Sequence, residues 1–257
     1  MRTIFVFFLV GVLISCSKDS EVENIYSVPE EFRLDMIQTI SSSGILPAFQ
    51  ITTLAKIGCS DQELRTEYFR KSNNAYIQII GVEILNNCIA GTDNVKAIIS
   101  DKFPEGVYNL RIGVKDQVEN LGTFTAGSDK YTISLHKSPN IMLGHHSVKK
   151  LPENIWWGSI YFDEKENSSF SATLLEYIKS NSTTWPDHQS GHYGLFSIDE
   201  GGSIVIEEYK NKPGYTGFCV KQNAQENEFI KNLSSLVSTL PGIKVFLASD
   251  KKVLINI

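Results

Sequence analysis

The sequence predicts a mixed fold in two domains, a β-sandwich followed by an α+β domain. Up to about residue 136, short segments alternate apolar and polar residues with a period of two, which is typical of half-buried strands. Clusters of Gly, Pro, Asp and Asn separate these segments at roughly ten-residue spacing, as in β-sandwiches. From about residue 140, two stretches with helical spacing of apolar residues interrupt the strands, which favours an α+β domain.

The first domain is placed at residues 29–138. We expect a short helix at 30–41, and after it strands at 75–85, 106–114 and 130–136. The strand at 106–114 shows the alternation most clearly. One set of side chains, predicted to face the core, is Tyr108, Leu110, Ile112 and Val114; the opposite set is Val107, Asn109 and Arg111.

The second domain, residues 139–257, has the expected order β-α-β-β, β-α-β-β. This order suggests an internal duplication, although the two halves share no evident sequence identity. Pro241-Gly242 closes the second helix. In chain order the elements are a strand at 155–162, a helix from about 168 to 178, a hairpin of 193–199 with 203–209, a strand at 215–221, a helix ending near 240, and a hairpin of 243–247 with 253–257.

The first fifteen residues have the pattern of an export signal. Arg2 gives a positive start, and residues 4–14 are apolar apart from Gly11. That run is shorter than the roughly 20 residues that span a bilayer as a helix, but it suits a secretory signal. It ends in Leu13-Ile14-Ser15-Cys16, which resembles the lipobox of bacterial lipoproteins. The alternative is an ordinary signal peptide followed by a chance cysteine.

The lipobox resemblance implies cleavage before Cys16 and a lipid anchor on that cysteine. Residues 16–28 would then be the lipidated cysteine and an acidic tether. Ser17 stands where an aspartate would signal inner-membrane retention, and the following lysine and acidic residues resemble the surface-export signal of Bacteroidota-type lipoproteins. We therefore expect an outer-membrane lipoprotein of the cell envelope, exposed at the surface. No later segment approaches the roughly 18 apolar residues of a membrane-spanning helix.

Composition and charge narrow the range of partners. The chain has 257 residues, 42% of them hydrophobic and 21% charged, as in globular proteins. The net charge is −5, and no cluster of lysine and arginine exceeds a pair. We therefore expect no nucleic-acid partner.

The cysteines fit an oxidising compartment. With Cys16 assigned to lipid, Cys59, Cys88 and Cys219 remain. Cys59 and Cys88 flank one predicted strand pair, so we expect a disulfide between them, with Cys219 left over.

The segment at about 45–136 resembles an immunoglobulin-like β-sandwich found in secreted lipoproteins of Bacteroidota-type bacteria. The residues that carry the resemblance are Cys59, the run 76–82 (YIQIIGV), Cys88, the run 103–112 (FPEGVYNLRI), Gly122-Thr-Phe-Thr and Tyr131. Such modules have no known catalytic residues, so the resemblance implies none here.

One loop could hold a metal ion. Asp187, His188 and His192 are ligand types that suit zinc, and His145 and His146 could complete the set. Pro186, Gly191 and Gly194 argue against a helix, so the two loop histidines need not share a face. The alternative is a solvated loop with two surface histidines.

Other catalytic patterns are weaker. Cys219 could act as a thiol nucleophile with His192 as base, although a buried structural thiol between Phe218 and Val220 is commoner. No Gly-x-Ser-x-Gly elbow and no Gly-x-Gly-x-x-Gly phosphate loop occurs. The carboxylates at 163–166 and 207–208 fit solvated strand ends better than a catalytic pair.

Aromatic residues indicate a binding role instead. Trp156 and Trp157 are adjacent in a predicted strand and must face opposite ways, so one of them is expected outside the core. With Trp185 and Tyr193 they could form a binding face for a sugar ring or a protein. The alternative is that the second sheet face is covered, which would bury both tryptophans.

The sequence therefore favours a non-catalytic envelope lipoprotein that binds a glycan, a peptide or a partner protein and needs no cofactor. The alternative is a metal-dependent hydrolase or lyase that uses the loop of Asp187, His188 and His192.

Overall fold

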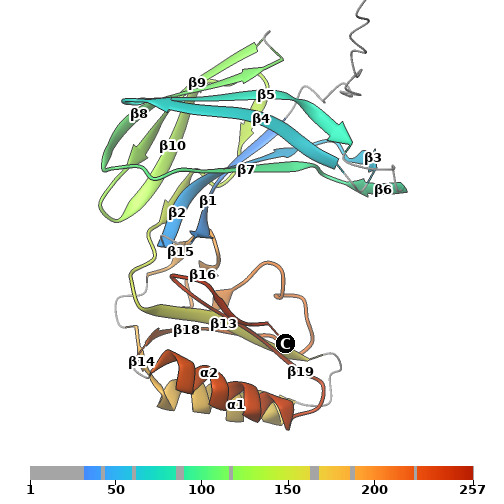
Figure 1. The fold of residues 1–257 in the computed structure, drawn as a ribbon, viewed down its shortest axis with the longest axis vertical. Coiled ribbons are helices and arrows are strands. Elements are labelled where there is room, and N and C mark those ends of the chain that lie inside the picture. The colour runs from blue at the N-terminus through green and yellow to red at the C-terminus, as the bar shows by residue number, and fades with distance from the viewer. Residues whose placement is uncertain are drawn as a thin grey trace, which may run out of the picture.

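The protein is mostly β-sheet. The computed structural model describes residues 32–41, 44–59, 62–84, 90–115, 118–162, 168–185, 189–222 and 225–256. The described residues contain two helices, and both lie at the lower end of the molecule in Figure 1. The export signal, Cys16 and the tether lie outside the described residues, so the structure leaves the lipid anchor as a prediction.

Two sheets are built from the first part of the chain. The smaller has the order β11-β1-β2-β7, and the larger has the order β12-β10-β9-β8-β5-β4. The β1–β11 and β5–β8 pairs are parallel, and the other pairs are antiparallel. The strands of the smaller sheet are β1 (Phe32–Ser41), β2 (Gly44–Thr53), β7 (Lys96–Ser100) and β11 (Ile141–Leu143). Those of the larger are β4 (Gln62–Lys71), β5 (Asn74–Ile84), β8 (Gly106–Val114), β9 (Val118–Ala126), β10 (Lys130–Lys137) and β12 (Ser147–Lys149).

One hydrophobic core joins these two sheets. Phe49 of the smaller sheet packs edge-on against Phe124 of the larger, with ring centroids 5.3 Å apart. Phe103, which precedes β8, packs against both rings. Buried side chains of both sheets belong to this cluster, among them Phe32, Leu34, Ile51, Ile77, Leu110, Ile112 and Ile133. The large apolar area removed from water here is what holds the two sheets together.

The alternation predicted for the first part of the chain is confirmed. Strand β8 spans the predicted residues Gly106–Val114, with its predicted inward set buried and Val107, Asn109 and Arg111 exposed. Strands β5 and β10 match the predicted 75–85 and 130–136 within a residue. A period of two survives because each of these strands has one face on the core and one face in solvent.

The predicted helix at 30–41 is wrong. Residues Phe32–Ser41 form strand β1, which pairs with β2 along its whole length. Phe32, Leu34 and Met36 are fully buried, so the apolar positions follow a period of two. Tertiary pairing with two neighbouring strands, β2 and β11, decides the structure of this segment and overrides the local preference for a helix.

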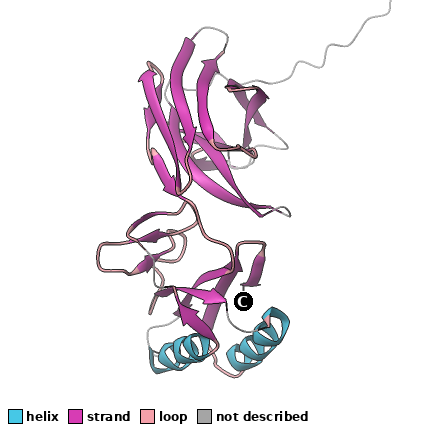
Figure 2. Ribbon diagram, turned by 90° about the vertical axis from the view of Figure 1, so that its left-hand side faces the viewer, coloured by secondary structure: helices cyan, strands magenta, loops and turns pink. Residues whose placement is uncertain are grey.

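The second part of the chain forms a five-stranded sheet with the order β14-β18-β13-β19-β20. All its pairs are antiparallel, and β13 is central. Helices α1 (Ser168–Ser180) and α2 (Glu226–Ser238) lie together against one face of this sheet (Figure 2). The strands are β13 (Ile155–Phe162), β14 (Ser182–Thr184), β18 (Thr216–Gln222), β19 (Ile243–Ser249) and β20 (Val253–Asn256).

The two faces of this sheet have separate cores. Trp156 packs with Leu174, Phe229 and Leu233 beneath the helices. On the other face Trp157 packs with Trp185, Phe196 and Ile198. A small sheet of β15 (Gly191–His192), β16 (Ser197–Ile198) and β17 (Ile204–Val205) contributes to this second core.

The predicted hairpin of 193–199 with 203–209 is much shorter than expected. Only two residues pair in each of β16 and β17, and residues 207–214 form turns. Tyr209 is nevertheless buried, stacked on Tyr161 at 5.0 Å between ring centroids. The apolar residues that suggested long strands, such as Ile206 and Tyr209, pack against the sheet that contains β13 instead of forming further strand pairs. The observed order is therefore β13-α1-β14, the small sheet, and then β18-α2-β19-β20.

The first and second parts of the chain touch through β1. The buried side-chain amide of Gln38 donates to the backbone carbonyls of Tyr193 at 2.6 Å and Lys149 at 3.0 Å. Gly194, with φ of +77°, lies so close to the backbone of Ile37 and Gln38 that a Cβ would overlap it. A side chain at this glycine would push the two parts apart.

The remaining two strands, β3 (Ile57–Cys59) and β6 (Ala90–Asp93), pair with each other in a separate two-stranded sheet. None of the helices in the described residues is long and apolar enough to cross a membrane.

Candidate functional site

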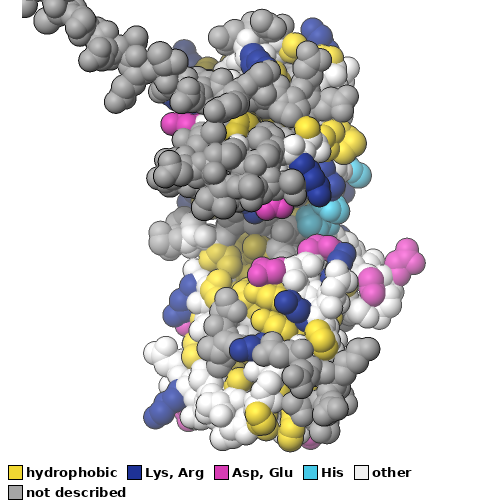
Figure 3. Space-filling model, turned by 90° about the vertical axis from the view of Figure 1, so that its right-hand side faces the viewer, with side chains coloured by type: hydrophobic (Ala, Val, Ile, Leu, Met, Phe, Trp, Pro, Cys, Tyr) yellow, Lys and Arg dark blue, Asp and Glu magenta, His cyan; other side chains and the backbone are white. Residues whose placement is uncertain are grey.

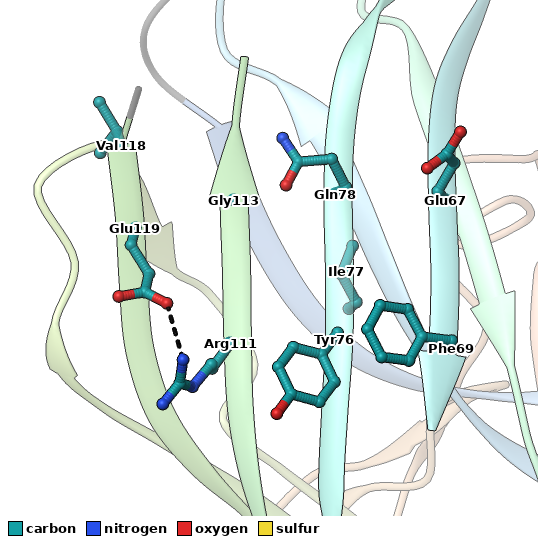
Figure 4. Close-up of a pocket in the computed structure, with 9 residues that line it drawn as sticks. All are labelled: Glu67, Phe69, Tyr76, Ile77, Gln78, Arg111, Gly113, Val118 and Glu119. Carbon is teal, nitrogen blue, oxygen red and sulfur yellow. Dashed lines mark hydrogen bonds and ion pairs between the residues drawn. The ribbon is translucent and has the colours of Figure 1, made fainter. Parts of the chain in front are cut away.

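The outer face of the six-stranded sheet carries a groove that crosses four strands, β4, β5, β8 and β9 (Figure 4). Register sets two rows of side chains across these strands. The first row joins Phe69, Tyr76 and Arg111, which are successive cross-strand partners. The second row, two residues along each strand, joins Glu67, Gln78, Gly113 and Glu119. Because side chains two residues apart share a face, both rows point to solvent.

An exposed aromatic pair forms one end of the groove. The rings of Phe69 and Tyr76 stack with centroids 4.5 Å apart and planes 9° apart. Phe69 is 59% exposed, although a phenylalanine gains about 1.5–3 kcal/mol from full burial. A cross-strand aromatic pair contributes only about 0.2–1 kcal/mol to a sheet. The pair is therefore a flat apolar surface that nothing in the described chain covers.

Charged groups lie beside this surface. The guanidinium of Arg111 is 5.8 Å from the centroid of the Tyr76 ring and forms a 3.3 Å ion pair with Glu119. Both partners of that pair are about half exposed, so the pair contributes little stability and can exchange for a ligand. Within the described residues, Glu67 and Gln78 make no side-chain hydrogen bond. Their acceptors and donors are available to a molecule in the groove.

Gly113 lets Gln78 lie across the second row. A Cβ at this position would overlap the side-chain amide of Gln78. The cavity lined by the two rows has a volume of about 280 Å³ and is open to solvent. An aromatic surface, an amide, a guanidinium and two carboxylates around one hollow can bind a ligand by stacking and hydrogen bonds together.

The residues expected to form a binding face behave differently. Trp156 and Trp157 do lie on opposite faces of the sheet, but they are 0% and 1% exposed. The expectation that one of them would be exposed is wrong, because the second face is covered. The cover is not a helix but the small sheet of β15 to β17 and the turns after it.

Trp185 and Tyr193 are brought together as expected, with ring centroids 5.6 Å apart in an edge-on arrangement. They are 7% and 3% exposed and form part of the wall of a second cavity, at the junction of the two parts of the chain. They therefore pack with Trp157 in one core rather than projecting as an open surface.

The residues of the proposed metal loop are only partly described. Asp187 and His188 lie outside the described residues. His192 stacks on His145, with ring centroids 4.0 Å apart, and its Nδ1 lies 3.1 Å from the Ser197 hydroxyl. The nitrogens of two stacked imidazoles lie in two parallel ring planes. Their lone pairs point outward within those planes, so they do not converge on one metal ion. Within the described residues, no three His, Cys, Asp or Glu side chains are grouped as a metal would need.

The environment of His192 keeps its ring neutral. Burial, and secondarily the charge of His145, lowers the pKa of His192 to about 4, while Asp35 and the Met36 backbone oppose this effect. Figure 3 shows histidine side chains gathered on one face near the middle of the molecule, beside lysine and arginine. The backbone N–H of His145 donates to the Asp35 carboxylate, and its carbonyl accepts from the Met36 N–H, both at 2.8 Å. The histidine pair therefore lies against β1, where that strand meets the second part of the chain.

The structure describes only part of the predicted arrangement of cysteines. Cys88 and the side chain of Cys59 lie outside the described residues, so their disulfide stays a prediction. The backbone of Cys59 pairs with Ala90, two residues from Cys88 in sequence. Cys219 has a free thiol, and burial raises the pKa of that thiol well above its usual range. This effect argues against a role as nucleophile, because the thiolate is the reactive form.

Sequence reasoning missed the groove. The sequence predicts that Arg111 is on the outward face of its strand, but its neighbours Phe69 and Tyr76 belong to strands whose pairing cannot be read from the sequence. The signal that could have indicated the groove was an aromatic residue on the solvent-facing side of each of two strands, Phe69 in β4 and Tyr76 in β5. Register, which a sequence does not contain, is what makes these residues neighbours.

Comparisons of this chain with family models, with curated proteins and with solved structures found no match.

Proposed function

We propose that this chain is a bacterial envelope lipoprotein that binds a glycan through the groove of Phe69, Tyr76, Gln78, Arg111 and Glu119. The observation that carries the proposal is the exposed, stacked pair of Phe69 and Tyr76 beside an amide and an exchangeable ion pair. Peptide and protein partners are the alternatives.

The chemistry of the groove fits a sugar ring. A pyranose has a face of C–H groups that packs on an aromatic ring, and hydroxyls around its rim. Phe69 and Tyr76 offer the flat apolar surface. Glu67, Gln78 and Arg111 offer hydrogen-bond acceptors and donors at its border. A peptide partner would instead use the unpaired backbone of an edge strand, and only β4 of these four strands is at an edge.

The proposed envelope role includes a domain division. The sequence places the division between residues 138 and 139, with an immunoglobulin-like β-sandwich before it and an α+β domain in the β-α-β-β, β-α-β-β pattern after it. Separate hydrophobic cores support two domains. Strands β11 and β12, with the buried Ile141 and Val148, belong to the sheets and core of the first, so we move the proposed boundary to the segment after Lys149. The proposed anchor is lipid on Cys16, followed by a tether to residue 28, at the outer membrane with the body at the cell surface. Placement at the surface would let the groove meet polysaccharides outside the cell.

Affinity electrophoresis with starch, xylan, mannan and pectin tests the glycan proposal. Phe69→Ala should weaken retardation by the bound polysaccharide at least about tenfold, because an aromatic anchor contributes more than about 2 kcal/mol to binding. Its thermal midpoint should stay close to that of the parent, since the ring is mostly exposed. Val107→Ala is the matched control, because Val107 is 56% exposed on the same sheet but outside the groove.

Failure of every polysaccharide to retard the parent protein would reject a glycan ligand of these classes. Equal weakening by Phe69→Ala and Val107→Ala would show that binding occurs elsewhere.

The anchor is tested separately. Metabolic labelling with a palmitate analogue should label the parent protein and leave Cys16→Ala unlabelled, with the variant lost from the membrane fraction. Mass spectrometry of the purified native protein should find an acylated cysteine at its N-terminus. A soluble mature chain that starts elsewhere would contradict the anchor.

A further inference from the structure

The charges in the groove on the six-stranded sheet do not balance. Three of the residues that line it are charged, namely Glu67, Arg111 and Glu119. Two carboxylates and one guanidinium give the groove a net charge of −1. The groove is therefore better suited to a cationic ligand than to an anionic one.

The only guanidinium among these lining residues is already engaged. Arg111 forms a 3.3 Å ion pair with Glu119 and lies 5.8 Å from the centroid of the Tyr76 ring. A ligand carboxylate that took Arg111 would leave the carboxylate of Glu119 unpaired beside it. An acidic sugar thus gains little on this side of the groove.

The opposite side of the groove carries an unpaired carboxylate. Glu67 is exposed on β4 and forms no ion pair within the part of the chain that the structure describes. Its cross-strand neighbour is the neutral Gln78, which lies between Glu67 and the Arg111–Glu119 pair (Figure 4). Arg65, two residues along β4, lines a different cavity and has another interaction. The charge of Glu67 is thus available to a ligand.

The exposed aromatic pair lies next to this carboxylate. Phe69 follows Glu67 by two residues, so the two side chains share the outer face of β4. The electron-rich faces of aromatic rings attract cations, and the guanidinium of Arg111 already lies near Tyr76. A carboxylate beside a stacked aromatic pair favours a ligand with a cationic group on an apolar body.

We propose that the glycan bound in this groove contains amino sugars with free, protonated amino groups, an inference that rests on the glycan-binding function proposed above. The ammonium group donates to the carboxylate of Glu67, and the C–H face of the sugar lies on Phe69 and Tyr76. The side-chain amide of Gln78 is available to a neighbouring hydroxyl. A neutral sugar would leave the charge of Glu67 uncompensated, and an acidic sugar would be repelled by it.

Titration calorimetry of the full-length chain at mildly acidic pH tests this proposal. The two probes are an oligomer of glucosamine and the same oligomer with every amino group acetylated, which removes the positive charge. The parent protein should bind the amino oligomer at least about threefold more tightly; the factor is modest because the ion pair is exposed. Added salt should reduce this preference.

Three variants assign the preference to the charges of the groove. Glu67→Gln should bind the two oligomers about equally, and Arg111→Gln should raise the ratio of the two affinities because it removes a positive charge from the groove. Glu63→Gln is the matched control. It removes the same charge from an exposed position of the same strand outside the groove, and should keep the parental ratio.

Several results would overturn the amino-sugar proposal. These are an absence of binding to the amino oligomer, equal parental affinities for the two oligomers, tighter binding of a galacturonate oligomer, or equal effects of Glu67→Gln and Glu63→Gln. Displacement of the amino oligomer by a lysine oligomer of equal length at the same concentration would show that the groove recognises a basic peptide instead.

The glycan-binding function fails by a different result. Phe69→Ala should weaken the binding of both oligomers, because the aromatic surface does not depend on charge. A neutral polysaccharide that binds the parent but not Phe69→Ala, together with equal affinities for the two oligomers, would uphold the groove and reject the amino sugar. Unchanged binding of every glycan by Phe69→Ala would reject the groove itself.

Discussion

The side-chain amide of Gln38 donates a buried 2.6 Å hydrogen bond to the backbone carbonyl of Tyr193, 155 positions away in the sequence. The same amide nitrogen donates to the carbonyl of Lys149 at 3.0 Å. Gln38 is only 3% exposed, and it is the point at which strand β1 meets both the end of β12 and the segment after β15. One polar side chain thus satisfies two carbonyls where the two parts of the chain join.

Gln38→Ala should destabilise the protein by about 1–3 kcal/mol, because two carbonyls lose their donor at a site that water reaches poorly. Urea unfolding followed by tryptophan fluorescence measures the change, since all three tryptophans lie in the second part of the chain. Gln50→Ala, at a half-buried position of the neighbouring strand β2, is the control. Equal midpoints for the two variants would show that the amide contributes nothing at the junction.

Stability should fall as the pH is lowered from about 7 toward 5, in part because of His192. Its pKa in the folded protein is lowered to about 4, whereas the unfolded chain has the ordinary value near 6.5. Between these values the unfolded state binds more protons, so acid favours unfolding; above the unfolded value the contribution is constant. His192→Gln should flatten the dependence of the thermal midpoint over this interval, where carboxylates stay mostly charged. An unchanged slope in the variant would contradict the assignment.

Trp156→Ala and Trp157→Ala should each destabilise the second part of the chain by about 3–5 kcal/mol, because both rings are fully buried. Trp156 leaves a cavity beneath α2, where it stacks on Phe229 at 4.3 Å. Trp157 leaves one beneath the small sheet, where it contacts Phe196. Chemical unfolding measures both losses. A near-parental stability for either variant would mean that its ring is a surface group.

Cys219 should react with iodoacetamide far more slowly at pH 8 than a model thiol does, because burial raises its pKa. In unfolding denaturant the reaction should become fast. Non-reducing peptide mapping of the same sample should find Cys59 joined to Cys88 and Cys219 unpaired. A peptide that links Cys219 to another cysteine would disprove both the predicted disulfide and the free thiol.

Local pattern predicted those elements in which one face is buried and one is solvated. Strand β8 is the clearest case, because its alternation of Tyr108, Leu110 and Ile112 with polar residues reflects its own two faces. Strand β13 shows the opposite case. Its residues from Ile155 to Ile160 are all buried, so the sequence located the strand but could not say that both of its faces are covered.

The sequence by itself determined strands β5, β8 and β10 of the first part, both helices of the second, and the alternate facing of Trp156 and Trp157. These properties depend on neighbours within a few residues, which local periodicity encodes. Only the tertiary structure decided that residues Phe32–Ser41 form a strand, that both tryptophans are buried, and that Phe69 stacks on Tyr76 beside Arg111. Each of these depends on strand register and on which segment covers which face. Contacts between residues distant in the chain set both, and no local pattern specifies them.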